Sequence, residues 1–264
     1  MLVRNTHFAV LLNANARKVT DRVIGSLTEI IPPDYIYLSR TAEEGDQYAR
    51  DILDRRFPMV FTGGGDGTVM HFINRMIAHR EADPCRVMPD VGILRLGTGN
   101  ALATMVSSGS YLVDIRSYAH NSHRDRQILA LAESESRRFP FGGLGWDAEL
   151  LNDYVRLKTW AAQGPMAPVV HNVVGYFLAL ASFTVPRRGK QLVSGTTPQV
   201  RIQNLGAPAH RLNHKGERIA EIPSGTTLFE GSANCTIFGT CPYYGWSPLA
   251  GSTCPFDTIC TRLR

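Results

Sequence analysis

Short apolar runs alternate with amphipathic stretches through the first half of the chain. The runs at residues 7–12, 35–38, 58–62 and 91–96 are typical of buried strands. Residues 18–31 and 42–56 carry apolar side chains at helical spacing, and further helices are expected over 69–78 and from Asn100. This alternation with short connections predicts an α/β fold with a mostly parallel sheet and helices on both faces.

The pattern changes after about Arg138. Gly and Pro become frequent, and one or two helices are expected within residues 160–182. Short strand-like runs then recur at 199–202, 226–229 and 235–238. We therefore expect an α/β domain over residues 1–135 and a β-rich domain over residues 136–264.

Charge and composition narrow the choice of partners. The 264 residues are 44% hydrophobic and carry a net charge of +5, so anionic partners are favoured: nucleotide phosphates, nucleic acid or an anionic membrane surface. Nucleic acid fits poorly because no recognised module appears and the basic residues are scattered. The sequence contains no run of 18 apolar residues and no secretory signal at its start, so we expect no transmembrane segment and a cytoplasmic protein. The oligomeric state is not indicated.

A glycine-rich turn after the third predicted strand carries the strongest chemical signal. Gly63, Gly64 and Gly65 precede Asp66, and Gly67 and Thr68 follow it. Amides exposed by such glycines can cradle phosphate oxygens, assisted by the N-terminus of the following helix. Asp66 does not favour a bare phosphate, so we expect it to hold Mg²⁺, directly or through water, or to accept a proton from an attacking hydroxyl. The alternative is an ordinary turn with Thr68 as helix cap and Asp66 in solvent.

Two further glycine turns extend this signal. Gly97, Thr98 and Asn100 follow the fourth predicted strand, at the sheet edge where ligands of parallel sheets bind. The segment 141–148 carries Asp147 after another set of glycines, and a second carboxylate would help to hold Mg²⁺. The alternative for Asp147 is an exposed position in a hairpin turn.

The order GGGDGT, GTGNALA and GLGWDA resembles the diacylglycerol kinase catalytic-domain superfamily, which includes diacylglycerol, sphingosine and ceramide kinases. The resemblance covers residues 7–150 well. It implies a nucleotide-binding first domain of the NAD kinase-like type and a sandwich-like second domain that binds lipid. It further implies a kinase that uses ATP and Mg²⁺ to phosphorylate a lipid hydroxyl of the diacylglycerol or sphingoid-base type, working peripherally at a membrane surface.

The same resemblance assigns individual residues. It implies ATP contacts from Asn13, Thr41, Gly63, Gly64, Gly65, Asp66, Gly67, Thr68, Gly97, Thr98 and Asn100. Asp66 and Asp147 would be the catalytic and metal-binding carboxylates, and in sphingosine kinases the position like Asp66 is assigned as the base. A soluble-substrate kinase of the NAD kinase type and a catalytically inactive nucleotide- or lipid-binding homologue remain alternatives.

The chain departs from the family in several places. Ala14 follows Asn13 where the family often has Pro, and Ala101 follows Asn100 where diacylglycerol kinases often have Asp. Family members usually continue beyond the segment like 243–246, so we expect a second domain truncated at its C-terminus, which leaves activity open. The basic cluster at 187–190 suits either anionic lipid headgroups or a solvated turn, and nearby apolar residues such as Trp160 and Phe177 suit either an acyl-chain pocket or a core.

Overall fold

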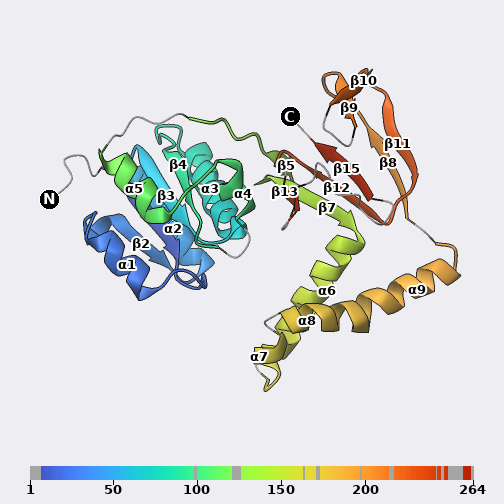
Figure 1. The fold of residues 1–264 in the computed structure, drawn as a ribbon, viewed down its shortest axis with the longest axis horizontal. Coiled ribbons are helices and arrows are strands. Elements are labelled where there is room, and N and C mark those ends of the chain that lie inside the picture. Colours follow the sequence, from blue (N-terminus) through green and yellow to red (C-terminus); the bar gives the residue numbers. More distant parts are fainter. Residues whose placement is uncertain are drawn as a thin grey trace. The chain divides into compact units, whose positions relative to one another are not determined.

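A computed structural model describes most of the chain (Figure 1). The described residues are 7–97, 100–120, 126–162, 164–170, 173–196, 198–213, 217–241, 243–244, 247–248 and 258–262. The chain divides into two compact units, Met1–Pro140 with Cys241–Ser247, and Phe141–Thr240 with Pro248–Arg264. Each unit is described by itself.

The first unit is built on a four-stranded parallel sheet. Its strands are β1 (Ala9–Asn13), β2 (Ile36–Ser39), β3 (Met59–Gly63) and β4 (Asp90–Leu94), in the order β2-β1-β3-β4. All three neighbouring pairs are parallel, so the predicted α/β fold class is confirmed. Leu12 lies opposite Gly63, and Gly63 lies opposite Leu94, so the carboxyl ends of three strands are level at one edge.

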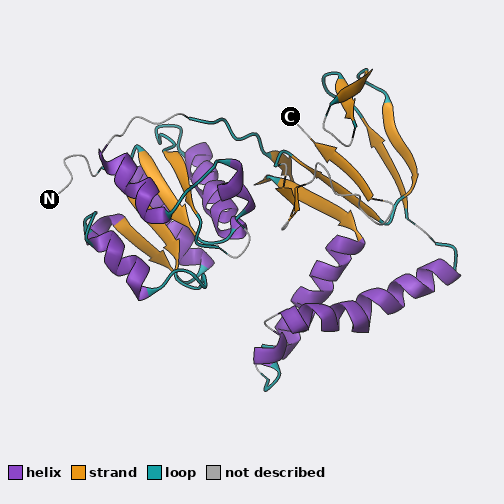
Figure 2. Ribbon diagram, in the orientation of Figure 1, coloured by secondary structure: helices purple, strands orange, loops and turns teal. Residues whose placement is uncertain are grey.

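Helices cover both faces of this sheet, as Figure 2 shows. In chain order they are α1 (Asp21–Thr28), the 3₁₀ turn η1 (Pro33–Tyr35), α2 (Ala42–Asp54), α3 (Asp66–Ala82), α4 (Ala101–Met105) and α5 (Tyr111–His120). Leu11 of β1 packs in a core with α2, α3 and α4, whereas its neighbours Val10 and Leu12 pack in a second core with α1 and α5. Alternate side chains of one strand thus enter opposite cores, which explains why the strands read as continuous apolar runs.

A short antiparallel hairpin completes the described part of the first unit up to Pro140. It pairs β5 (Ala132–Ser134) with β6 (Arg137–Phe139). The side-chain amide of Asn74 in α3 donates to the Arg138 carbonyl and accepts from the Arg138 N–H, both at 2.8 Å. This two-way bond fixes the hairpin on α3.

The second unit is rich in strands, as predicted. The strands from 141 onward are β7 (Phe141–Gly145), β8 (Gln199–Gln203), β9 (Ala209–Leu212), β10 (Arg218–Ile222), β11 (Thr227–Ser232), β12 (Cys235–Gly239) and β15 (Thr258–Arg262). β12 lies between β7 and β15, and the pairs β8–β11 and β9–β10 form antiparallel ribbons. Residues 241–247 belong to the first unit, and there the short strand β13 (Tyr243–Tyr244) pairs with β14 (Ser247–Pro248).

A long helical segment interrupts the strands of the second unit. It contains α6 (Trp146–Ala161), α7 (Ala167–Val170), α8 (Val173–Ala179), the π-helical turn η2 (Leu180–Thr184) and α9 (Val185–Val193). In the part of the chain that the structure describes, no helix combines the length and apolar character needed to cross a bilayer.

This helical segment is longer than the sequence predicted. Glycines and prolines within 164–189 had argued for breaks, and a solvated turn had been one alternative for the basic cluster at 187–190. That alternative is wrong because the cluster lies inside α9. Pro186 is tolerated there because the preceding turn η2 is widened to a π-helix, which relieves the helical ladder next to a residue that has no N–H.

Candidate functional site

Three loops of the first unit meet where the sheet strands end. Asn13 closes β1, Gly63 closes β3 and Leu94 closes β4, and these strands are neighbours in the sheet. Parallel α/β sheets bind their ligands at this carboxyl edge. The candidate site is therefore assembled by the strand order and not by proximity in the sequence.

The first and second glycine turns are in direct backbone contact. A Cβ atom added to Gly97 would lie 2.5 Å from the Gly64 carbonyl oxygen and 2.5 Å from the Gly65 Cα. No side chain fits at such distances, so Gly97 is required by the close approach of two backbones. The two turns form one surface of main-chain atoms, as a phosphate cradle needs.

Asp66 joins the two turns through its carboxylate. It is the first residue of α3, and Gly65 is the N-cap. One carboxylate oxygen accepts the Ala101 N–H and the other accepts the Leu102 N–H, each at 3.0 Å. Asp66 thus caps α4 from outside, and the alternative of a solvated carboxylate is wrong. Each oxygen keeps a further lone pair, so the carboxylate can still take part in binding a metal-bound water.

Asn100 closes the second turn. Its backbone lies in the left-handed region, with φ 73° and ψ 38°, a conformation that Asn tolerates better than most residues. Its side chain accepts the Gly97 N–H at 2.9 Å and donates to the Gly97 carbonyl at 2.8 Å. Thr98, also predicted to contact ATP, lies outside the described residues.

The end of β1 is attached to the first glycine turn. The side-chain N–H of Asn13 donates to the Thr68 hydroxyl at 3.0 Å, and its side-chain oxygen Oδ1 accepts the backbone N–H of Asn15 at 2.9 Å. Gly65, and not Thr68, holds the N-cap position of α3. The alternative of Thr68 as the helix cap is therefore wrong, and its hydroxyl connects β1 to α3.

Thr41 lies at the same edge but has a local role. It follows β2 and is the N-cap of α2, where its hydroxyl accepts the Glu44 N–H at 3.2 Å. An ATP contact from Thr41 would have to share this hydroxyl. Of the predicted nucleotide-binding residues, the structure brings together Asn13, residues 63–68, Gly97 and Asn100, whereas Thr41 lies after the edge strand β2, at the start of α2.

Two arginines at this edge escaped the sequence analysis. Arg40 directly follows β2 and Arg95 directly follows β4, and both are exposed. Cations at the carboxyl ends of parallel strands favour an anionic ligand. Both lie near the carboxyl ends of predicted strands, two positions beyond the run 35–38 and within the last two positions of the run 91–96, and that position was the signal that could have found them.

Asp147 belongs to the second unit. It lies in the first turn of α6, after Gly145, whose φ of 95° makes it a glycine position. The alternative of a hairpin turn at Asp147 is therefore wrong. Burial, and then the negative charge of Asp147, raise the pKa of Tyr176 in α8 above its ordinary value, which places Asp147 near the junction of α6 and α8.

The first unit has features that suit the phosphate groups of a nucleoside triphosphate. The main chain has open space beside Gly65 and Gly67, α3 contributes its N-terminus, and Arg95 supplies positive charge. A metal has less support, because the described residues contain no group of three His, Cys, Asp or Glu placed to hold an ion. Mg²⁺ often binds through one or two carboxylates together with substrate phosphates, so a protein-only cluster is not needed.

Residues 7–131 match the family described as Diacylglycerol kinase catalytic domain. The predicted family resemblance is confirmed. This match ends just before β5, so it covers the four-stranded sheet, its helices and both glycine turns of the first unit.

Two plant diacylglycerol kinases are similar to part of the chain. The chain is 32% identical to Diacylglycerol kinase 7 of Arabidopsis thaliana over 108 residues, and 31% identical to Diacylglycerol kinase 3 of the same plant over 102 residues. These stretches cover 39% and 37% of this chain, and the chain spans only about a fifth of the length of each relative, 21% and 20%.

A solved Bacillus anthracis structure, provisionally assigned as a diacylglycerol kinase, has a similar fold. Its TM-score is 0.51 at 16% identity, over 91% of this chain and 68% of the other. At this identity the likeness supports the two-part architecture alone.

Proposed function

We propose that this chain takes part in the ATP-dependent phosphorylation of a lipid hydroxyl, of the diacylglycerol or sphingoid-base type. The observation that carries the proposal is the joined pair of glycine turns at the carboxyl edge, inside the segment that matches the diacylglycerol kinase catalytic domain. The acceptor lipid would be met at a membrane surface, by a cytoplasmic protein that binds the membrane peripherally.

The phosphates of ATP would lie against the N-terminus of α3. In the first turn of a helix, N–H groups lack helical partners, so those of Asp66 and Gly67 can donate to phosphate oxygens. The exposed Arg95 and Arg40 would balance the phosphate charge. Asn13, Thr68 and Asn100 would keep the surrounding loops in place through the hydrogen bonds described above.

Mg²⁺ would be held by Asp66 together with the phosphates of ATP, and it would neutralise charge on the transferred group. Asp147, in the second unit, stays a predicted metal ligand. In the transfer, the lipid oxygen forms a bond to the γ-phosphorus while the bond from that phosphorus to the bridging oxygen breaks. The hydroxyl proton passes to a base. Asp66 remains the predicted acceptor, although its two amide bonds equally favour a role in positioning the second turn.

The decisive experiment is a transfer assay with ATP labelled at the γ-phosphate. Diacylglycerol, sphingosine and ceramide are presented separately in mixed micelles, and NAD is offered in solution. We expect label on one of the lipids. Label on NAD alone would replace the proposal with the soluble-substrate kinase.

A second candidate is a protein that binds the nucleotide without transferring phosphate. The engagement of both Asp66 oxygens by Ala101 and Leu102 favours it, because a carboxylate used in this way has a structural role whether or not transfer occurs. Saturable ATP binding with no label on any acceptor would establish this candidate.

A further inference from the structure

The helical segment of the second unit exposes a row of large apolar side chains. We define the hairpin apolar face by its members on α6, α8 and α9, with their exposed fractions: Trp160 74%, Val174 51%, Phe177 62%, Leu178 37%, Val185 55% and Leu192 72%. Core positions of the first unit, such as Phe72 at 1%, bury residues of the same kind. Isolated exposed apolar residues are common on proteins, whereas a row along one structural element marks an interaction surface.

The spacing shows that members of this face share one side of a helix. Val174 and Leu178 are four residues apart in α8, and Val185 and Leu192 are seven apart in α9, so each pair lies on one side of its own helix. Ala179 and Thr184, by contrast, are fully buried, and α8 and η2 pack against α6. The segment therefore has a side that faces its own partner helix and a side that faces outward.

Charge around the face is positive. Residues 151–193 contain five Lys and Arg but a single acidic residue, Asp153. Asp153 is only 2% exposed and is neutralised by Arg187, whose two guanidinium nitrogens lie 2.9 and 3.1 Å from its oxygens. Arg156 and Lys190 remain exposed. Glu149, at the start of α6, pairs with Arg188 at 3.0 Å. An anion that approaches this face thus meets the exposed Arg156 and Lys190, while Glu149 and Asp153 are already paired with arginines.

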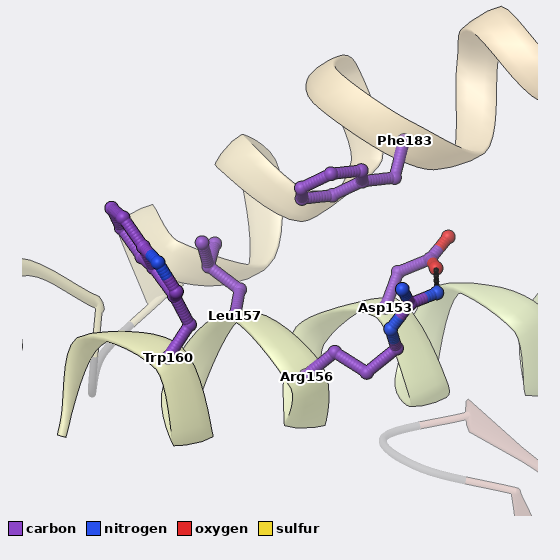
Figure 3. Close-up of a pocket in the computed structure, with 5 residues that line it drawn as sticks. All are labelled: Asp153, Arg156, Leu157, Trp160 and Phe183. Carbon is purple, nitrogen blue, oxygen red and sulfur yellow. Dashed lines mark ion pairs between the residues drawn. The ribbon is translucent and has the colours of Figure 1, made fainter.

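A cleft lies between α6 and the turn η2, as Figure 3 shows. It has a volume of about 310 Å³ and is lined by Asp153, Arg156, Leu157, Trp160 and Phe183. The indole of Trp160, Leu157 and the Phe183 ring make its apolar part, and Arg156 lies toward its charged end. An apolar cleft beside an exposed guanidinium matches an amphiphile with an acyl chain and an anionic headgroup.

We propose that the hairpin apolar face docks on an anionic lipid bilayer. Outward apolar side chains would enter the boundary between headgroups and acyl chains, and Arg156 and Lys190 would meet lipid phosphates and carboxylates. Trp160 is of the residue type enriched at that depth. Docking of this kind would serve the proposed lipid kinase, but it is a property of the second unit and does not require phosphate transfer.

The test is co-sedimentation of the full chain with vesicles, in the absence of ATP. One set of vesicles contains phosphatidylcholine alone, and the other contains equal amounts of phosphatidylcholine and phosphatidylserine. We expect binding to the mixed vesicles to be at least about tenfold tighter and to weaken as salt is added. Free glycerophosphoserine should not compete, which separates a lipid surface from a soluble headgroup.

Matched variants locate the surface. Leu192→Ser should weaken vesicle binding about tenfold, whereas Leu205→Ser, at an 80% exposed leucine outside the helices, should leave it unchanged. Lys190→Gln should weaken it about fivefold, and Lys18→Gln of the first unit should not. Both leucines are exposed, so unchanged thermal unfolding will confirm that these variants fold.

Three outcomes would overturn the proposal. The parent chain could fail to bind the mixed vesicles, or Leu192→Ser could bind as tightly as Leu205→Ser. Light scattering could also show a dimer that Leu192→Ser dissociates, which would assign the face to a second copy. None of these depends on whether the chain transfers phosphate, so the kinase proposal can fail or stand separately.

Discussion

The two units use the same kinds of side chain in opposite ways. In the first unit Phe8, Phe72 and Leu102 are no more than 1% exposed, and the polar groups at the sheet edge bond to one another. In the helices of the second unit Phe177 and Leu192 are 62% and 72% exposed. The first unit buries its apolar side chains in its own cores, whereas the described helices of the second unit leave large apolar side chains exposed.

A carboxylate from each unit makes a second comparison, because both join two elements. Asp66 binds two backbone amides of α4, and Asp153 binds a guanidinium and the Thr184 hydroxyl. The first arrangement shapes a loop surface of bare main chain, and the second fixes two helices side by side. The carboxylate of the first unit therefore positions the loops of the proposed ligand site, whereas the one of the second unit stabilises helix packing.

The largest expected effect follows from replacing Asp66. Asp66→Ala removes both acceptors of the α4 amides and the charge proposed to act in transfer, so phosphate transfer should fall by at least about a hundredfold. Asp114→Ala is the matched control, because Asp114 likewise accepts one backbone N–H, from Gly109 at 2.9 Å, but at α5. Equal activity in Asp66→Ala and the parent would remove Asp66 from the site.

The contact between the glycine turns is tested at Gly97. Gly97→Ala forces a methyl group against the Gly64 and Gly65 backbone and should lower the free energy of unfolding of the first unit by about 1–3 kcal/mol. Gly25→Ala, inside α1 with no atom near its added Cβ, should instead raise it by about 0.5–1 kcal/mol. Denaturant unfolding of both variants measures the difference. Unfolding free energies that change alike would contradict the close approach.

The packing role of Asp153 predicts a pH dependence. Burial acts to raise the pKa of Asp153, but hydrogen bonds from Arg187 and Thr184 outweigh it, so the pKa lies below the ordinary value. A lowered pKa means that the ionised carboxylate stabilises the fold above the unfolded-state pKa of about 3.9, and this stability is lost as the pH falls through the folded-state pKa. The second unit should therefore unfold more easily in acid, below about pH 4.

The same ion pair can be removed at neutral pH. Asp153→Asn should lower the free energy of unfolding of the second unit by roughly 1–2 kcal/mol, because Arg187 is partly exposed and solvent compensates part of the loss. It should also flatten the acid dependence. A parent and variant with identical pH profiles would show that Asp153 does not titrate with unfolding.

The smallest effect concerns Arg95, one of the two arginines that the sequence analysis missed. Arg95→Gln should weaken ATP binding about fivefold through the loss of one cation beside the phosphates. Arg50→Gln, on α2 and paired with Asp54, is the control and should bind ATP like the parent. Calorimetric titration with ATP distinguishes them.

Much of the first unit could be predicted from sequence because its signals are local. Buried strands such as β1 and β3 appear as short apolar runs, and the glycine turns mark their ends. The contact of Asp66 with Ala101 and Leu102 could not be predicted, because it joins residues 35 and 36 positions apart and depends on β3 and β4 being neighbours. The start of α3 at Asp66 was missed because its N-cap, Gly65, has no side chain to signal it.

The second unit was harder to predict for a different reason. Gly175, Pro186 and Gly189 lie within helices, although each is a residue that normally interrupts them. The open side of α9 leaves space around Gly189, and the π-helical turn accommodates Pro186. The space at Gly189 and the widened turn before Pro186 are features of the folded structure and not of the local sequence. The sequence pattern therefore indicated the strands of this unit but not the extent of its helices.

The central claim is that the first unit binds ATP and the helices of the second unit bind a lipid bilayer. Hydrogen exchange of the full chain tests this claim most directly. ATP with Mg²⁺ and vesicles of phosphatidylcholine and phosphatidylserine are added separately. The account predicts that ATP slows exchange at residues 64–68 and 100–102, whereas the vesicles slow it at residues 174–192. Protection of the same segment by both ligands, or no effect of ATP on either glycine turn, would contradict it.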